Sequence, residues 1–163
     1  MLKKAITYTD FNDNVKTKNY YFNLTKPELM EMKRSPLYEM QEVVERIRGM
    51  ENPDEKLSYE EKDEIQEQMG AILRNLVIQS YGVKSEDGER FSKRVGNRRY
   101  GAGEDFVETM AYEALYMEMI SDINNLLNFV RAVIPADVRS NLDNIPELKD
   151  NIIPMPTSSS DEE

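Results

Sequence analysis

The segment SYEEKDEIQEQMGAILRNLVIQSY, residues 58–81, carries the amphipathic pattern on which the fold depends. Ser58 and Glu61 have capping-box spacing, in which a hydroxyl accepts from a free backbone amide and the glutamate three residues later reaches back. Beyond them, apolar residues recur at about 100° per residue, the period of a helix. These residues are Ile65, Met69, Ile72, Leu73, Leu76 and Val77. The pattern predicts a central core helix that ends near Tyr81.

Two shorter helices are predicted before this one. Thr25 and Glu28 repeat the capping-box spacing, so a helix should begin there. It must be short, because Pro36 cannot donate to a continuing helix. Ser35 and Pro36 instead suit the cap and first residue of a second helix, which should end near Gly49.

The N-terminal region predicts a β-hairpin. Residues 4–9 and 15–22 are rich in β-prone side chains and flank a turn at residues 12–14. The turn consists of asparagine and aspartate, which tolerate the left-handed conformations that hairpin turns require. Because two strands alone are marginally stable, the hairpin should pack against the helices.

A helix is also predicted over residues 104–120, and it carries two apolar stripes where a surface helix needs one. The first stripe consists of Phe106, Met110, Ala114 and Met117. The second, roughly opposite, consists of Tyr112, Leu115, Tyr116 and Met119. Such a helix is either central in its domain or shares one side with a partner. Because tyrosine and methionine suit contact surfaces, the second stripe is the candidate partner-binding site.

The chain should finish with one more helix and a tail. Apolar residues at helical spacing predict the helix, and Pro135 ends it. They are Ile123, Leu126, Leu127, Val130, Val133 and Ile134. Residues 136–163 are rich in proline, serine and acidic side chains, which predicts a flexible acidic tail that folding does not require, with residues 148–155 as a short candidate binding segment. The expected architecture is therefore mainly α: a hairpin plus helical domain over residues 1–135, then the tail.

Composition excludes several functions. The chain has 163 residues, a formal net charge of -10, no cysteine and no histidine. Without these two residue types it lacks a thiolate nucleophile and the usual general base at neutral pH, so neither enzymatic activity nor a cofactor is expected. No stretch approaches the roughly 18 apolar residues of a membrane span. The net charge disfavours polyanionic partners. We expect a soluble cytoplasmic protein.

The segment SYGVKSEDGERF, residues 80–91, resembles a calcium loop in its acidic residues around a glycine. The ligand spacing fails, because Val83 falls on a ligand position and Arg94 stands where the closing glutamate should be. A structural role fits better: Gly82 is predicted to cap the long helix, and the SEDG sequence to form a turn. The carboxylates of Glu60, Glu64 and Glu67 share a helix face, which is typical of a solvated surface rather than a metal site.

A basic run follows at residues 89–103, ERFSKRVGNRRYGAG. Its cations alternate with Phe91 and Tyr100, which is the composition of a groove for single-stranded nucleic acid. The cations are Arg90, Lys93, Arg94, Arg98 and Arg99. An exposed loop that balances the acidic linker before Ser58, which begins with ENPDEK at residue 51, or that meets an acidic partner, explains the same residues. A nucleic-acid-binding or regulatory protein is therefore the alternative function, and the net charge opposes it.

Three segments together resemble a known family. KKAITYTDFND...NYYFNLTKPEL, SYGVKSEDGERF and AYEALYMEMISDINNLLNFVRAVIP occur in this order and are similar to the tail assembly chaperones of long-tailed, siphovirus-type bacteriophages, especially those of Gram-positive hosts. The resemblance spans residues 1–135. The insert RVGNRRYGAGED and the acidic tail depart from the family pattern.

The resemblance implies a protein without enzymatic activity that works in the host cytoplasm. Its partner would be the tape measure protein, which it would keep soluble while the tail tube polymerises. The tail tube protein and a second copy of the chain are further candidate partners, whereas a membrane or nucleic acid is not expected. Many members of this family are made in two lengths by ribosomal frameshifting.

Overall fold

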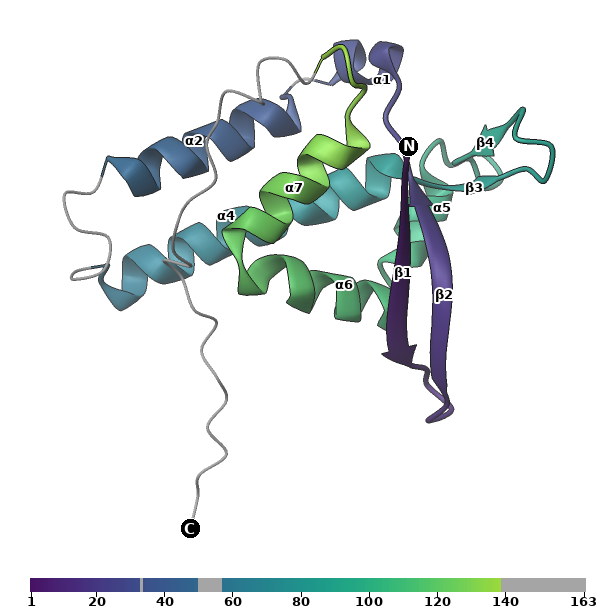
Figure 1. The fold of residues 1–163 in the computed structure, drawn as a ribbon, viewed down its shortest axis with the longest axis horizontal. Coiled ribbons are helices and arrows are strands. Elements are labelled where there is room, and N and C mark those ends of the chain that lie inside the picture. Colours follow the sequence, from purple (N-terminus) through teal and green to yellow (C-terminus); the bar gives the residue numbers. More distant parts are fainter. Residues whose placement is uncertain (33, 50–56, 139–163) are drawn as a thin grey trace.

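A computed structural model describes residues 1–32, 34–49 and 57–138, which form a small antiparallel sheet beside a helical body (Figure 1). The sheet has four strands in the order β1-β2-β3-β4. In chain order the elements are β1 (Leu2–Thr9), β2 (Val15–Phe22), α1 (Lys26–Glu31), α2 (Pro36–Arg48), α4 (Tyr59–Ser80), β3 (Tyr81–Lys84), β4 (Phe91–Ser92), α5 (Gly101–Phe106), α6 (Met110–Ser121) and α7 (Ile123–Val133).

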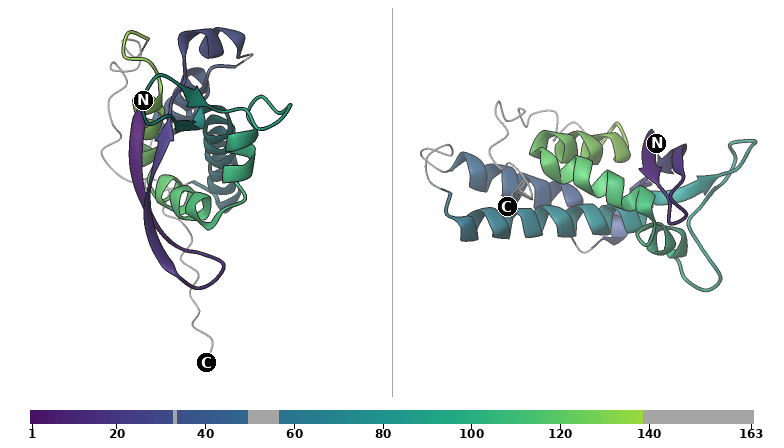
Figure 2. Two further views of the ribbon diagram at one scale, coloured as in Figure 1. Left: turned by 90° about the vertical axis from the view of Figure 1, so that its right-hand side faces the viewer. Right: turned by 90° about the horizontal axis from the view of Figure 1, so that it is seen from below.

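The predicted hairpin is confirmed. Strands β1 and β2 pair along their whole length, from Leu2 opposite Phe22 to Thr9 opposite Val15. At the turn, Asp13 adopts a left-handed φ of 62°. The even-numbered side chains of β1 face the helices and the odd-numbered ones face solvent, and Figure 2 shows the helical body on one side of this hairpin. Only 4% of Ile6 is exposed, so the hairpin contributes directly to the core.

The hairpin turn should have a characteristic pH response. The Lys16 ammonium, 2.5 Å from the Asp10 carboxylate, and the amides of Asn14 and Asn12 hold the pKa of Asp10 down, from 3.8 to about 2. Because the folded pKa lies below the ordinary value, this carboxylate stabilises the turn above about pH 4, and the contribution is lost as the pH falls from 3.8 towards 2. An NMR titration of the Asp10 side chain should find it still ionised at pH 3. Half-protonation near pH 4 would contradict the prediction.

The predicted helix starts are also confirmed. Thr25 with Glu28 and Ser58 with Glu61 both form complete capping boxes, and the Ser35 side chain accepts from the amide of Leu37 at the start of α2. All six apolar residues predicted to face the core from α4, and all six from residues 123–134, are buried. Helix α2 adds Met40, Val43, Val44 and Ile47 to the same core.

The segment after α4 corrects one prediction. Gly82 does not cap the helix: α4 ends at Ser80, and the chain continues through Tyr81 into β3, which pairs with the end of β2. A Cβ on Gly82 would lie 2.5 Å from the ring of Phe91 in β4, so glycine here allows a close contact inside the sheet. The predicted SEDG turn does occur, with Gly88 at a φ of 76°, and it joins β3 to β4. The sheet therefore has two strands more than the sequence predicted.

The helix predicted over residues 104–120 is in fact two helices. Helix α5 ends at Phe106 and α6 begins at Met110. Thr109 forms the junction, because its hydroxyl donates to the carbonyl of Phe106 at 2.7 Å and accepts from the amide of Tyr112 at 3.3 Å. A threonine that caps a new helix in this way interrupts what looks like a continuous apolar pattern.

Two predicted features lie outside the described residues. They are most of the acidic linker, at residues 51–56, and the tail from residue 139, including the candidate segment 148–155. Of the helices in the described ranges, none combines the length and apolar character needed to cross a membrane.

Candidate functional site

The candidate stripe on α6 is divided between the core and the surface. Leu115 is fully buried and Met119 is 3% exposed, so both pack inside the domain. Tyr112 and Tyr116 are only partly buried. Met117, which belongs to the first stripe, is 47% exposed. Packing of α6 against β1, α4 and α7 therefore buries part of the second stripe, and only its two tyrosines are accessible.

These tyrosines line a surface hollow of about 670 Å³, which we call the tyrosine groove. Its apolar lining comes from four parts of the chain: Phe11, Ala71, Val107, Met110, Tyr112 and Tyr116. The turn between β1 and β2 supplies Phe11, which is 79% exposed. The two tyrosine rings lie 5.9 Å apart. Helical spacing could not identify Phe11, because it lies far from α6 in the sequence and only the folded hairpin places it beside that helix.

Helix α4 forms one wall of the tyrosine groove. The Tyr116 hydroxyl lies against Gly70, where a Cβ would be 2.5 Å from the oxygen. Burial raises the pKa of Tyr112, although Arg74 nearby opposes the shift. The phenol therefore stays neutral at physiological pH. Glu67, Glu108 and Glu113 add carboxylates to the lining. The groove combines neutral aromatic surface with an acidic surround.

A second apolar hollow, the α1–α2 groove, was not predicted. Its volume is about 580 Å³, and its apolar lining is Leu29, Met30, Leu37, Tyr38 and Val138. Met30 is 86% exposed and Tyr38 69% exposed. The sequence signal that could have revealed this groove is the presence of large apolar side chains, such as Met30 and Tyr38, on helix faces that do not point into the core.

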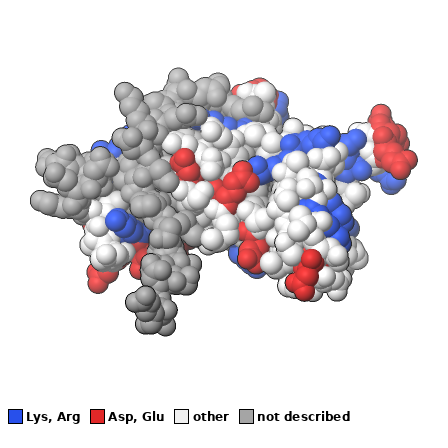
Figure 3. All heavy atoms as spheres, turned by 60° about the horizontal axis from the view of Figure 1, so that its bottom comes forward, with Lys and Arg blue, Asp and Glu red and all other residues white. Residues whose placement is uncertain are grey.

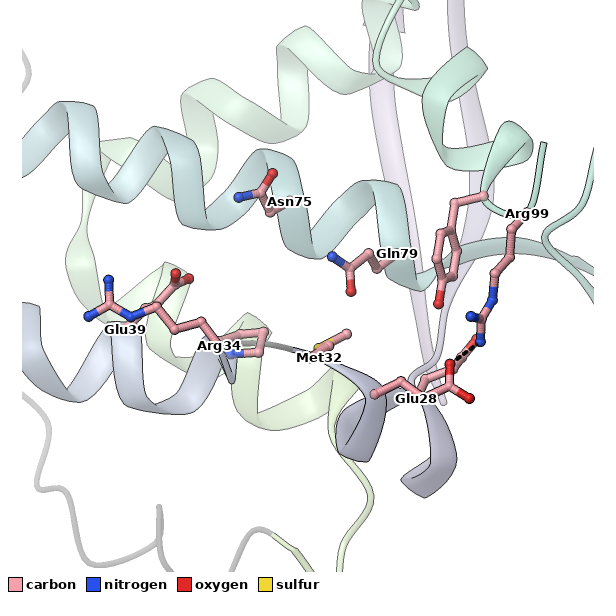
Figure 4. A pocket seen from close by; sticks show the side chains of 10 residues that line it. Glu28, Met32, Arg34, Glu39, Asn75, Gln79 and Arg99 are labelled. Atoms are coloured by element: carbon pink, nitrogen blue, oxygen red, sulfur yellow. Dashed lines mark hydrogen bonds and ion pairs between the residues drawn. The ribbon is translucent and has the colours of Figure 1, made fainter.

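A third hollow, of about 390 Å³, is polar and lies between α1, α2 and α4. Figure 4 shows Gln79 of α4 pointing into it and Arg99 reaching α1 from the far side. Arg99 pairs with Glu31 and Arg34 with Glu42, and burial raises the pKa of the Glu39 carboxyl, which also lines the pocket. Within residues 1–32, 34–49 and 57–138, no group of three acidic side chains could hold a metal ion. The polar lining of this pocket therefore includes two paired arginines, the amides of Asn75 and Gln79, and acidic side chains.

The basic run is largely neutralised by the protein itself. Lys93 is 9% exposed and contacts both carboxylate oxygens of Glu28, at 2.7 and 2.8 Å. Arg98 bonds Glu104 and Asp105 at 3.0 Å each, and Arg99 pairs with Glu31. The other two cations, Arg90 and Arg94, are exposed. Figure 3 shows lysine and arginine side chains gathered towards the sheet end of the molecule, beside an acidic tip. This arrangement weakens the case for a nucleic-acid groove.

Comparison with known proteins gives a family. The model of the family described as phage tail assembly chaperone matches residues 1–161. The match extends past the 1–135 span of the resemblance and includes most of the acidic tail. Neither the curated proteins nor the solved structures gave a match. The chain belongs to the phage tail assembly chaperone family.

Proposed function

We propose that this chain binds the tape measure protein of a long-tailed phage and keeps it soluble in the host cytoplasm while the tail tube assembles. Family membership supports a role in tail assembly without enzymatic activity. A tape measure protein is long and largely helical, and its apolar stripes would associate wrongly before the tube covers them. A soluble acidic protein that presents an apolar groove can shield such a stripe. The Gram-positive host implied by the resemblance stays a prediction.

The tyrosine groove is the observation that carries this proposal. It places the exposed ring of Phe11 beside Met110, Tyr112 and Tyr116 on the surface of a chain with a net charge of -10. Methionine and aromatic side chains accept apolar partners of varied shape. The carboxylates of the lining favour a helix whose apolar face is flanked by lysine or arginine. Leu115 and Met119, both buried, serve this site by fixing the orientation of α6.

Binding can be tested by placing a charge in the groove. Ala71 is exposed on α4 and lines the groove, so Ala71→Glu adds a carboxylate with a residue that favours helices and leaves the core unchanged. A carboxylate on the apolar lining would be buried against the apolar face of the partner, which should weaken binding at least about tenfold, the equivalent of 1.4 kcal/mol. We expect Ala71→Glu to lose co-purification with the co-expressed tape measure protein at an unchanged melting temperature.

Met117→Glu is the matched control. It adds the same charge at an exposed position of α6 that does not line the groove, so it should co-purify like the wild type. If Ala71→Glu co-purifies as well as Met117→Glu, the tyrosine groove is not the binding site. The tail tube protein and a second copy of the chain stay predicted partners, and no observation on the paired cations favours nucleic acid.

A further inference from the structure

We propose that the α1–α2 groove binds a segment of this same chain, LKDNIIPM at residues 148–155. The groove presents apolar side chains, and the last described residue, Val138, lies in its lining. The proposed docking is independent of the tyrosine groove and of the proposed function, since it concerns a different surface and a different ligand.

The groove leaves large apolar side chains unburied. Met30 and Tyr38 are 86% and 69% exposed, and Leu29 and Leu37 line the hollow between them. Lys26, Ser35 and Gln41 provide its polar lining. A hollow of about 580 Å³ with this lining is large enough for two or three aliphatic side chains of an extended segment.

The end of the last described segment is fixed at the groove. Val138 itself lines it, and its amide donates to the carbonyl of Pro135 at 3.0 Å. Lys26, another lining residue, forms an ion pair with Asp137. The chain that follows therefore starts at the mouth of the hollow. The ten residues from Val138 to Leu148 can span up to about 35 Å, so reach does not limit docking.

Tethering favours this occupant over others. A segment joined by a short linker has an effective concentration in the millimolar range, whereas a second copy or another protein must compete from solution. Closing a loop of this length costs little more than closing a shorter one, because the entropy grows only with the logarithm of length. Even a weak fit is then enough to fill the groove.

The segment's chemistry matches the lining. It offers Leu148, Ile152, Ile153 and Met155, and Pro154 favours an extended backbone that could lie along a groove. The family match covers residues 1–161 and so includes this segment. Its docking would cover Met30 and Tyr38 in the free chaperone.

The absence of cysteine from the chain makes a direct test possible. The full-length double variant Met30→Cys/Ile152→Cys places one thiol in the groove and one in the segment. Under mild oxidation at micromolar protein concentration, we expect an intramolecular disulfide. The control is Tyr59→Cys/Ile152→Cys: Tyr59 is 87% exposed at the start of α4, away from the groove. The groove pair should form at least about ten times faster, which corresponds to 1.4 kcal/mol of preference.

Adding Tyr38→Ser to the groove pair should slow its disulfide to the control rate. Tyr38 is mostly exposed, so this change removes groove surface without disturbing the core. Equal rates for the groove and control pairs would overturn the proposal, because the segment would then show no preference for the groove. Disulfides mainly between chains would also overturn it, because the tethered segment would then have no advantage over another copy. Co-purification with the tape measure protein plays no part in this test, so either proposal can fail alone.

Discussion

Replacing Gly103 with alanine should destabilise the protein by about 3 kcal/mol or more. A Cβ at this position of α5 would lie 2.1 Å from the carbonyl oxygen of Ile78 and 2.6 Å from its Cα and carbonyl carbon. These are backbone atoms of α4, so no side-chain rotation can relieve the clash, and α5 would have to move away from α4. The direction of the change in unfolding free energy distinguishes a close contact from an ordinary helix position. In an exposed helix the same substitution stabilises by up to about 1 kcal/mol.

Gly49→Ala is the control for this substitution. Gly49 is exposed at the end of α2 with right-handed helical angles, and a Cβ there meets its nearest neighbour at 3.3 Å. Its effect on the free energy of unfolding should be within about 0.5 kcal/mol. Urea denaturation of both variants gives the comparison. A Gly103→Ala protein as stable as the wild type would mean that α5 does not contact α4 as closely as described.

Removing the carboxylate of Glu28 should have the second large effect, about 3–5 kcal/mol. The ammonium of Lys93 contacts both Glu28 oxygens and the carbonyl of Asn23, at 2.6–2.8 Å. Only 9% of the Lys93 side chain and 15% of the Glu28 side chain are exposed, and burial lowers the pKa of Lys93. Glu28→Ala would remove the counter-ion of this ammonium and leave it with a hydrogen bond to the carbonyl of Asn23 and a position 5.8 Å from the centre of the Phe91 ring.

Two further variants distinguish the contribution of this ion pair to stability from that of the helix cap. Glu28 also completes the capping box of α1, and Thr25→Ala, which breaks that box alone, should cost about 1 kcal/mol. Glu28→Ala/Lys93→Met should recover part of the stability lost in Glu28→Ala, because it removes the unpaired buried charge. If Glu28→Ala costs no more than Thr25→Ala, the ion pair does not stabilise the fold. The pair connects the basic run to α1, which the sequence alone could not show.

The sequence predicted the features that local chemistry determines. The capping boxes at Thr25 and Ser58 and the asparagine-rich hairpin turn act through neighbours a few residues away. The core faces of α4 and α7 follow from helical spacing alone. Strands β3 and β4 are different, because four and two residues are too few to show an alternating pattern. Gly82 after a helix resembles a cap in sequence, and only its pairing with β2 makes it part of a strand.

The candidate site could be predicted only in part, for the same reason. Helical spacing identified Tyr112 and Tyr116 but could not show which stripe of α6 would be buried. That outcome depends on packing against β1, α4 and α7, all distant in sequence. Phe11 joins these tyrosines only through the hairpin. The basic run looked like a nucleic-acid patch because the partners of Lys93 and Arg99, Glu28 and Glu31, are more than sixty residues away.

The central claim is that the chain keeps a tape measure protein soluble, and the partition of that protein between supernatant and pellet tests it most directly. The tape measure protein of the same phage would be expressed alone, with the wild-type chain and with Ala71→Glu. We expect it in the pellet when alone, in the supernatant with the wild type, and in the pellet again with Ala71→Glu. A tape measure protein that partitions identically with and without the wild-type chain would contradict the account.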